Sequence, residues 1–380
     1  MASSSTIRRS SIWKTSTMTI SRTSARVVDS GSTMANNGFT WKWRLSELPA
    51  PTDDSPTVFS TFSCGGGSSM GYKRAGFRVI GCCEIDKRVL DIYCKNLHPE
   101  HPVLADLRDF NRTLRDDGVP EWLREIDVLD GSPPCSTFSL SGSREKAWGK
   151  EKVFKEGQAK QTLDDLFFVF LDTVELLRPK VVVAENVVGL AAGNARGYVN
   201  EILKRFRQLG YYVQMFQLNS AFMDVPQSRK RVFFVANRMG WRDLKLDFNG
   251  EPIPFGVVRS KDSGEKPSPT SVIGSMARRS LPSDRSLADV CKRERGKGSF
   301  FNNRFVDDDR LCPTIPASCK LIRRCDLKYL TDTDIRNCST FPQDYDFGNQ
   351  DVAFVCGMSV PPNMMANVAK QVREQWLSKR

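Results

Sequence analysis

The sequence has 380 residues, and its 56 Lys and Arg side chains outnumber its 44 Asp and Glu side chains, which gives a formal net charge of +12 at pH 7. This length allows two or three domains with a substantial core, and the basic excess favours a polyanionic partner. Only two histidines, His98 and His101, are present. That scarcity argues against a Ser-His-Asp triad and a His-rich metal site, so any nucleophile must be activated without a dedicated imidazole.

The N-terminal region and the cysteines bear on where the protein is located in the cell. Residues 1–33 are rich in Ser and Thr, basic, and without the apolar core of a secretory signal. We interpret them as a disordered tail or as sequence upstream of a start at Met34, with an organellar transit peptide as the alternative. No apolar run approaches the roughly 18–20 residues of a bilayer span. Eleven scattered cysteines without C-x-x-C spacing indicate reduced thiols in an intracellular compartment.

The elements predicted along the chain alternate between strands and helices. A linker rich in Pro and Asp at 48–57 precedes them. Strands are predicted at 58–64, 77–83, 103–106, 126–129, 181–184, 213–218 and 231–236. Helices are predicted at 68–75, 161–177, 197–209, 331–341 and 361–378. This alternation predicts an α/β fold with a doubly wound, mostly parallel sheet covered on both faces.

A glycine-rich turn follows the first predicted strand, in the segment VFSTFSCGGGSSMG. Glycines at this point let the backbone approach a ligand, and the helix that follows supplies free N–H groups. Glu84, which ends the second strand, is placed to accept bonds from ribose hydroxyls, and Asp106, after the third, from an adenine amino group. The match to G-x-G-x-x-G is poor, so S-adenosylmethionine, an adenosine without phosphates, suits the crevice better than a dinucleotide. The alternative is an ordinary glycine-rich turn of an α/β fold.

Two further strand ends carry reactive side chains. Cys135 follows Pro133-Pro134 at the carboxyl end of one strand, and Glu185 ends a later strand at the same sheet edge, where burial would hold its carboxyl protonated at neutral pH. Each residue alone is more often structural, as a buried thiol or a surface acid. Together they suit methylation of cytosine, because thiolate addition at C6 makes C5 nucleophilic towards a methyl sulfonium while a bond at N3 stabilises the developing charge.

A third motif is Gln227-Ser228-Arg229-Lys230-Arg231, just before the last predicted strand of the sheet. Alternation along an extended chain predicts that Gln227, Arg229 and Arg231 point to one side. Arginine forks suit phosphate or base oxygens, although an isolated arginine pair is more often a solvated surface feature.

In this order, the motifs resemble those of cytosine-5 DNA methyltransferases of the bacterial or phage restriction–modification type, over about residues 57–378. The resemblance rests on Phe62-Ser63-Cys64-Gly65-Gly66-Gly67, Glu84 with Asp106, Gly131-Ser132-Pro133-Pro134-Cys135, Glu185-Asn186-Val187, Gln227-Ser228-Arg229-Lys230-Arg231, Leu330-Thr331 to Phe341-Pro342, and Gly357-Met358-Ser359-Val360-Pro361. The chain departs from the family at Cys64, where Gly is usual, at Ser136, where Gln is frequent, and at Met358, where Asn is common. The last departure puts side-chain support for the cofactor there in doubt.

The resemblance implies a Rossmann-like fold that uses S-adenosyl-L-methionine, with no metal. The implied catalytic residues are Cys135, Glu185, Arg229 and Arg231. The implied cofactor-binding residues are Phe62, Ser63, Gly65, Gly66, Gly67, Glu84, Ile85, Asp106, Leu107, Pro133 and Ser359. The implied substrate-binding residues are Gln227, Pro134 and Ser139.

The resemblance also implies an organisation and partners. It predicts a tail and linker at 1–56, a catalytic and cofactor domain at 57–239, a smaller irregular target-recognition domain at 240–324, and a C-terminal segment at 325–380 that returns to the catalytic domain. The chain would be a cytoplasmic monomer in a bacterium or phage-infected cell (nuclear or organellar in a eukaryote), with a cognate restriction endonuclease as a functional partner. Its substrate would be double-stranded DNA, from which the target cytosine is flipped.

The charge distribution fits this organisation. Residues 240–330 hold 18 Lys and Arg against 12 Asp and Glu, whereas the catalytic domain is nearly balanced. Residues 143–160 carry six basic side chains against three acids, and we expect them to close over DNA as a loop, with a solvated surface helix as the alternative.

Three other functions remain open at this point. A related subgroup methylates cytosine in tRNA on the same scaffold, although the variable region of about 85 residues favours DNA. A catalytically silent DNA-binding regulator is disfavoured by the intact Cys135 and Glu185. A nicotinamide dehydrogenase is disfavoured by the missing G-x-G-x-x-G.

Overall fold

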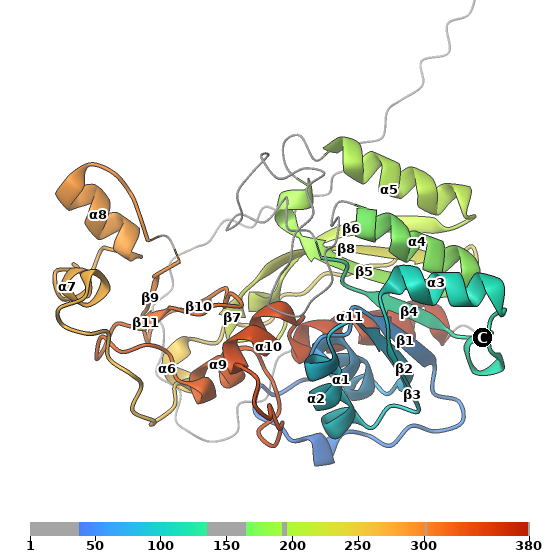
Figure 1. The fold of residues 1–380 in the computed structure, drawn as a ribbon, viewed down its shortest axis with the longest axis horizontal. Coiled ribbons are helices and arrows are strands. Elements are labelled where there is room, and N and C mark those ends of the chain that lie inside the picture. The colour runs from blue at the N-terminus through green and yellow to red at the C-terminus, as the bar shows by residue number, and fades with distance from the viewer. Residues whose placement is uncertain (1–37, 135–164, 192–195, 301, 379–380) are drawn as a thin grey trace, which may run out of the picture. The chain divides into compact units, whose positions relative to one another are not determined.

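A computed structural model describes residues 38–134, 165–191, 196–300 and 302–378. In this part of the chain a seven-stranded sheet lies between two layers of helices (Figure 1). The strand order is β3-β2-β1-β4-β5-β8-β6, and β8 runs antiparallel to both of its neighbours. The strands are β1 (Thr57–Thr61), β2 (Arg78–Glu84), β3 (His101–Leu104), β4 (Val128–Gly131), β5 (Val181–Val187), β6 (Tyr212–Asn219) and β8 (Lys230–Asn237).

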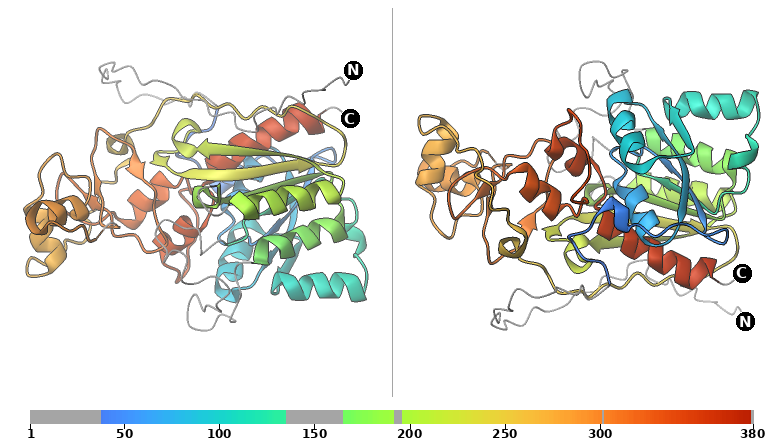
Figure 2. Two further views of the ribbon diagram at one scale, coloured as in Figure 1. Left: turned by 90° about the horizontal axis from the view of Figure 1, so that it is seen from above. Right: turned by 90° about the horizontal axis from the view of Figure 1, so that it is seen from below.

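The helices cover both faces of this sheet. Helices α3, α4 and α5 lie on one face, and α1 and α11 lie on the other (Figures 1 and 2). The helices are α1 (Gly67–Arg74), α2 (Lys87–Leu97), α3 (Leu107–Asp116), α4 (Leu166–Leu177), α5 (Arg196–Gln208), α6 (Phe255–Val258), α7 (Val272–Arg278), α8 (Leu287–Arg295), α9 (Asp332–Cys338), α10 (Val352–Met358) and α11 (Pro362–Val372). Short 3-10 turns span Leu45–Glu47, Glu121–Leu123, Val188–Ala191 and Ser220–Phe222, and a π-helical turn, Arg373–Leu377, follows α11.

Strand β5 shows why the sheet is covered on both sides. Val182 and Ala184 point into the core under α3, α4 and α5, whereas Val181 and Val183 point into the core under α1 and α11. All four side chains are fully buried, as expected for a strand whose successive side chains alternate between two covered faces. The predicted doubly wound, mostly parallel α/β fold is therefore confirmed.

Several helices were not predicted from the sequence. Helix α3 buries Leu107, Phe110 and Leu114, a narrow apolar stripe at positions i, i+3 and i+7. Charged residues outnumber this stripe in LRDFNRTLRD, so the segment has the composition of a loop. Helices α2, α7, α8 and α10 were missed as well, because short helices carry little periodic signal.

Residues 39–48 differ from the tail and linker expected over 1–56, because they pack against the rest of the chain. The Trp43 side chain is 2% exposed, and its Nε1 donates to the Thr340 carbonyl at 2.8 Å. The Arg74 guanidinium lies 4.4 Å from the centre of the Trp43 ring and 5.1 Å from that of Phe39. Two aromatic rings and one cation therefore fix this segment.

The region after β8 contains two kinds of structure. Phe255 and Val258 of α6 share a core cluster with Ile335 and Cys338 of α9. Strand β7 (Gln227–Ser228) pairs with β10 (Cys312–Pro313), and β9 (Phe305–Val306) pairs with β11 (Ile322–Arg323). By contrast, α7 and α8 form a separate small cluster with Phe305 and Ile322.

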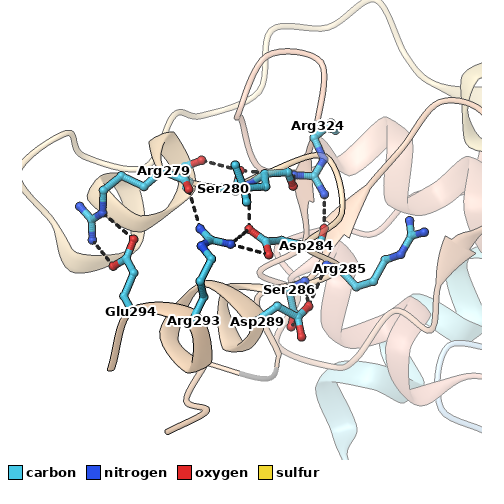
Figure 3. Close-up of polar contacts among 11 residues, drawn as sticks. Arg279, Ser280, Asp284, Arg285, Ser286, Asp289, Arg293, Glu294 and Arg324 are labelled. Atoms are coloured by element: carbon cyan, nitrogen blue, oxygen red, sulfur yellow. Dashed lines mark hydrogen bonds and ion pairs between the residues drawn. The ribbon is translucent and has the colours of Figure 1, made fainter. Parts of the chain in front are cut away.

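Ion pairs tie the α7 and α8 region together (Figure 3). Arg279 pairs with Glu294 at 2.9 Å, and Arg293 pairs with Asp284 at 2.5 Å. The Arg324 guanidinium donates to the Asp284 carbonyl. Electrostatic pairing therefore supplements a small apolar core in this region.

One stretch of the described residues, Val352–Leu377, is long and apolar enough by composition to cross a membrane. Of its most apolar window, 83% is buried inside the protein. Packing of α10 and α11 against the rest of the chain accounts for this apolar composition.

Candidate active site

The strand order brings the predicted motifs to one edge of the sheet. It reverses between β1 and β4, which places a crevice at the carboxyl ends of these neighbouring strands. Strand β1 leads into the glycine-rich turn, β4 leads into Ser132-Pro133-Pro134, and Glu185 lies near the end of β5. Cys135, Ser139 and residues 143–160 lie outside the described residues.

The backbone that leads to Cys135 is attached to β5. Asn186, which is 4% exposed, donates from Nδ2 to the Pro133 carbonyl at 3.1 Å. Pro133 itself is buried, and Pro134 is partly exposed. Asn186 is the residue after Glu185 in β5, so this hydrogen bond places Pro133, two residues before Cys135, close to Glu185.

Glu185 forms an ion pair with Arg231. Arg231 Nε lies 2.8 Å from Glu185 Oε1, and both side chains are mostly buried. The antiparallel pairing of β5 with β8, in which Val187 lies opposite Arg231, brings the two side chains together. The sequence argument considered only burial of the Glu185 carboxyl. In the structure the positive charge of Arg231 also acts on it.

Gln227 and Arg229 have different surroundings from Arg231. Gln227 Nε2 donates to the Cys338 carbonyl, and its Oε1 accepts from the Ile315 N–H at 3.1 Å. Arg229 donates to the carbonyls of Ile315 and Gly357, and desolvation lowers its pKa to about 9. Arg229 lies between β7 and β8, its guanidinium is taken up by these two carbonyls, and Arg231 and Glu185 are charged groups that act on it. Of the two arginines, Arg231 is therefore the one that pairs with Glu185.

The glycines of the turn after β1 are required by the chain's own packing. A Cβ at Gly65 would lie 2.3 Å from Val355 Cγ1, and one at Gly67 would lie 2.1 Å from the Val360 carbonyl oxygen. Gly66 has a φ of +78°, which favours glycine. The sequence argument assigned these glycines to ligand approach, whereas in the structure the C-terminal segment occupies the space beside Gly65 and Gly67, and Leu97 of α2 occupies the space beside Gly66.

Glu84 is fixed beside that turn by three backbone donors. Its carboxylate accepts from the N–H groups of Cys64 at 2.8 Å, Ile85 at 2.9 Å and Asp86 at 3.0 Å. Burial raises the pKa of Glu84, and these hydrogen bonds act in the opposite direction. The thiol of Cys64 is unsuited to act as a nucleophile, because burial and the Glu84 charge raise its pKa to about 12.

Asp106 and Leu107 begin α3. Asp106 caps the helix by accepting from the Arg108 N–H at 2.8 Å, and its carboxylate also pairs with the Arg108 guanidinium at 3.4 Å. The Leu107 side chain is buried in the core. Both predicted cofactor-binding residues thus have structural contacts, and Asp106 lies at the carboxyl end of β3.

A pocket lies between the β1 turn, the end of β4 and the segment after α10. It is lined by Ser60, Phe62, Ser63, Cys64, Gly67, Ser68, Asp130, Ser132, Met358, Ser359 and Val360. The hydroxyls of Ser63 and Ser359 are buried and have no hydrogen-bond partner among the described residues. Unpaired buried hydroxyls are costly, and a polar ligand in this pocket would satisfy them.

Asp130 is the pocket residue that sequence reasoning missed. It is 1% exposed, and Ser60 Oγ donates to its Oδ2 at 2.8 Å. Desolvation raises its pKa to about 7, Glu185 adds to this shift, and the hydrogen bond from Ser60 opposes it. The available signal was an acid at the end of the otherwise apolar strand that precedes Cys135.

A doubly wound sheet with an antiparallel β8, a crevice without a phosphate-binding glycine pattern and a fixed acid at the end of β2 defines an α/β fold of the methyltransferase type. Residues 57–294 match the family described as C-5 cytosine-specific DNA methylase. The chain belongs to this family.

Individual comparisons agree with this assignment. The chain is 36% identical over 188 residues to the type II methyltransferase M1.HphI of Haemophilus parahaemolyticus, covering 49% of this chain and 47% of that protein. It is 25% identical over 354 residues to M.MthTI of Methanothermobacter thermautotrophicus, covering 83% and 97%. The chain spans about half the length of the first of its curated relatives.

The fold also resembles solved structures. A candidate DNA modification methyltransferase encoded within an E. coli prophage superimposes with a TM-score of 0.61 at 17% identity, covering 84% of this chain and 99% of that one. At this level of identity the likeness concerns the fold alone.

Proposed function

We propose that this chain methylates C5 of cytosine in double-stranded DNA, with S-adenosylmethionine as the methyl donor. The observation that carries the proposal is the hydrogen bond from Asn186 to the Pro133 carbonyl, which starts the Cys135 segment beside the Glu185–Arg231 pair. Family membership supports the same reaction.

The residues of the crevice fit S-adenosylmethionine. Glu84 is a fixed acceptor for ribose hydroxyls, and Asp106 lies at the next strand end for the adenine. The unpartnered hydroxyls of Ser63 and Ser359 suit the polar amino-acid moiety. When bound, this cofactor supplies an electrophilic methyl group on a sulfonium.

The protein groups have separate roles in the proposed reaction. The Cys135 thiolate adds to C6 of the flipped cytosine, which makes C5 nucleophilic. Glu185 forms a hydrogen bond with N3 of the cytosine ring, where charge develops. Arg231 holds the Glu185 carboxyl in position through the 2.8 Å ion pair. Methyl transfer to C5 leaves S-adenosylhomocysteine; a base then removes the C5 proton, the bond between C6 and sulfur breaks, and Cys135 leaves as a thiolate, which restores the aromatic ring.

We assign DNA recognition to residues 240–324, within which α7 and α8 form a small ion-paired cluster apart from the sheet (Figures 1 and 3). Residues 57–239 form the catalytic domain in this proposal, and residues 325–380 complete it through α9, α10 and α11. A role in restriction–modification, with a cognate endonuclease, is part of the same proposal.

Transfer of tritium from labelled S-adenosylmethionine tests this function, with duplex DNA and tRNA as parallel substrates. We expect label in duplex DNA and a covalent adduct with duplex DNA that contains 5-fluorocytosine. Label in tRNA alone would favour the RNA alternative, and binding of DNA without label or adduct would favour a silent regulator. Bisulfite sequencing of DNA from expressing cells then gives the target sequence.

A further inference from the structure

Asp130 is a buried carboxyl without a positive partner. It lies near the end of β4, where it is 1% exposed and faces the pocket between the β1 turn and the segment after α10. Among the described residues, no Lys, Arg or His side chain forms an ion pair with it. A buried carboxylate without a counter-ion is unfavourable, so the position requires an explanation.

The groups that face Asp130 come from three elements. From β1, Ser60 Oγ donates at 2.8 Å, and from α1, Tyr72 OH donates at 3.4 Å. Ser68 of α1 also contributes a stabilising hydrogen bond, and Glu185 of β5 is the negative charge that acts on Asp130. Three hydroxyls thus stabilise the carboxylate, while burial and a second acid destabilise it.

The pocket presents two opposite polarities. On one side, α1 begins at Gly67, and its first N–H groups favour an anion. The unpartnered hydroxyls of Ser63 and Ser359 lie in the same pocket and can donate to that anion. On the other side, Asp130 favours a cation. An amino-acid zwitterion has this pair of charges.

We propose that Asp130 is the counter-ion for the α-ammonium group of the cofactor's amino-acid moiety, so that cofactor binding is coupled to ionisation of this carboxyl. The proposal rests on the proposed function, because it requires S-adenosylmethionine in this pocket. The carboxylate of the ligand lies towards the start of α1, and its ammonium lies towards the end of β4.

The coupling has a defined sign. In the free protein the pKa of Asp130 is raised to about 7, so the carboxyl is largely protonated below pH 7. A bound ammonium favours the ionised form, and binding therefore releases a proton below pH 7. Affinity consequently rises with pH, by about tenfold between pH 5.5 and pH 7. The range stops there because a free α-amino group begins to lose its own proton above it.

Calorimetric titration of the full chain with three ligands tests the proposal. S-adenosylmethionine and S-adenosylhomocysteine carry the ammonium, whereas 5′-methylthioadenosine lacks the whole amino-acid moiety. In wild-type protein we expect the first two to bind about tenfold more tightly at pH 7 than at pH 5.5, with proton release, and the third to bind equally at both. Asp130→Asn should abolish this pH dependence and weaken the first two at least tenfold at pH 7, leaving 5′-methylthioadenosine within twofold.

Asp127→Asn is the matched control, because Asp127 is also a buried aspartate but lies just before β4, at the opposite end of the strand, where it pairs with Lys180 at 2.7 Å. It should keep the wild-type pH profile. If Asp130→Asn fails to fold, Ser60→Ala replaces it: loss of the donated hydrogen bond should move the pH midpoint upwards and lower affinity for both amino-acid ligands at pH 7 about threefold.

Other outcomes overturn the proposal in distinguishable ways. Unchanged affinity and pH profile in Asp130→Asn would exclude the counter-ion role while leaving the proposed function intact. A loss for S-adenosylmethionine alone would place Asp130 against the sulfonium and overturn the ammonium assignment. If wild-type protein bound none of the three ligands, the cofactor in the proposed function would itself be wrong.

Discussion

A buried aspartate lies near each end of β4, and the two aspartates have opposite charged neighbours. Asp127, just before the strand, accepts from the Thr57 N–H at 2.8 Å and pairs with Lys180 at 2.7 Å. Asp130, at the carboxyl end, receives hydroxyl donors and has Glu185 as its charged neighbour. The amino end is therefore neutralised by the protein itself, whereas the carboxyl end is left suited to a ligand. In a doubly wound sheet this is the end at which ligands bind.

Replacement of Cys135 by Ala should produce the largest effect at the carboxyl end. Without the thiol, C5 of cytosine is not activated, and we expect methyl transfer to fall by about 10⁴-fold or more. Thermal unfolding and S-adenosylhomocysteine binding, measured alongside tritium transfer, should stay at wild-type values. Retained turnover would show that the nucleophile is another residue.

Glu185→Gln should have the next largest effect. The amide keeps the size of the side chain but loses the negative charge that pairs with Arg231 and the ability to carry a proton to N3. We expect the methyl-transfer rate in a single turnover to fall by about 10²–10³-fold, with little change in DNA affinity. An equal loss in DNA affinity and rate would indicate a role in binding instead of chemistry.

Asp127→Asn tests the amino end, where the comparison predicts a loss of stability with no loss of chemistry. The substitution leaves Lys180 without its partner and weakens a contact to the Thr57 N–H. We expect the free energy of unfolding to fall by about 2 kcal/mol, as measured by denaturant titration, with the turnover of the remaining folded protein unchanged. A fall in turnover without a fall in stability would contradict the division between the two ends.

The sequence predicted the sheet well, because its strands are short apolar segments followed by turn residues. Val181-Val182-Val183-Ala184 is such a segment, and it forms most of β5. The glycine-rich turn, Glu84, Asp106, Cys135 and Glu185 were predicted because each ends or follows a strand, and parallel strands end at one edge. The positions of Glu84 and Glu185 at this edge could therefore be predicted without knowing how the chain packs.

The parts that sequence reasoning missed depend on contacts between distant segments. Trp43 is ordered by Thr340, nearly three hundred residues away, and no local pattern predicts that contact. Alternation grouped Arg229 with Arg231, but no local pattern predicts that the Arg229 guanidinium donates to the carbonyls of Ile315 and Gly357. Asp130 was missed because a sequence does not show whether a buried carboxyl has a positively charged partner.

Asp130→Asn should change the free energy of unfolding with the opposite sign to Asp127→Asn. The pKa of Asp130 is raised from its ordinary value to about 7 by burial, so the unfolded chain ionises at lower pH than the folded one. The free energy of unfolding of the wild-type protein therefore falls as pH rises from about 4 to about 7 on account of this group. The asparagine removes that penalty while keeping a hydrogen-bond partner for Ser60.

Without ligand, the variant should consequently match wild-type stability near pH 4.5 and exceed it at pH 8, by about 3 kcal/mol. Calorimetric unfolding at the two pH values measures this difference. Addition of S-adenosylhomocysteine should reduce the advantage of the variant at pH 8, because the wild-type carboxylate then has its counter-ion and binds the ligand more tightly. A variant less stable than wild type at pH 8 without ligand would mean that Asp130 is a structural residue like Asp127, and the contrast between the two ends of β4 would disappear.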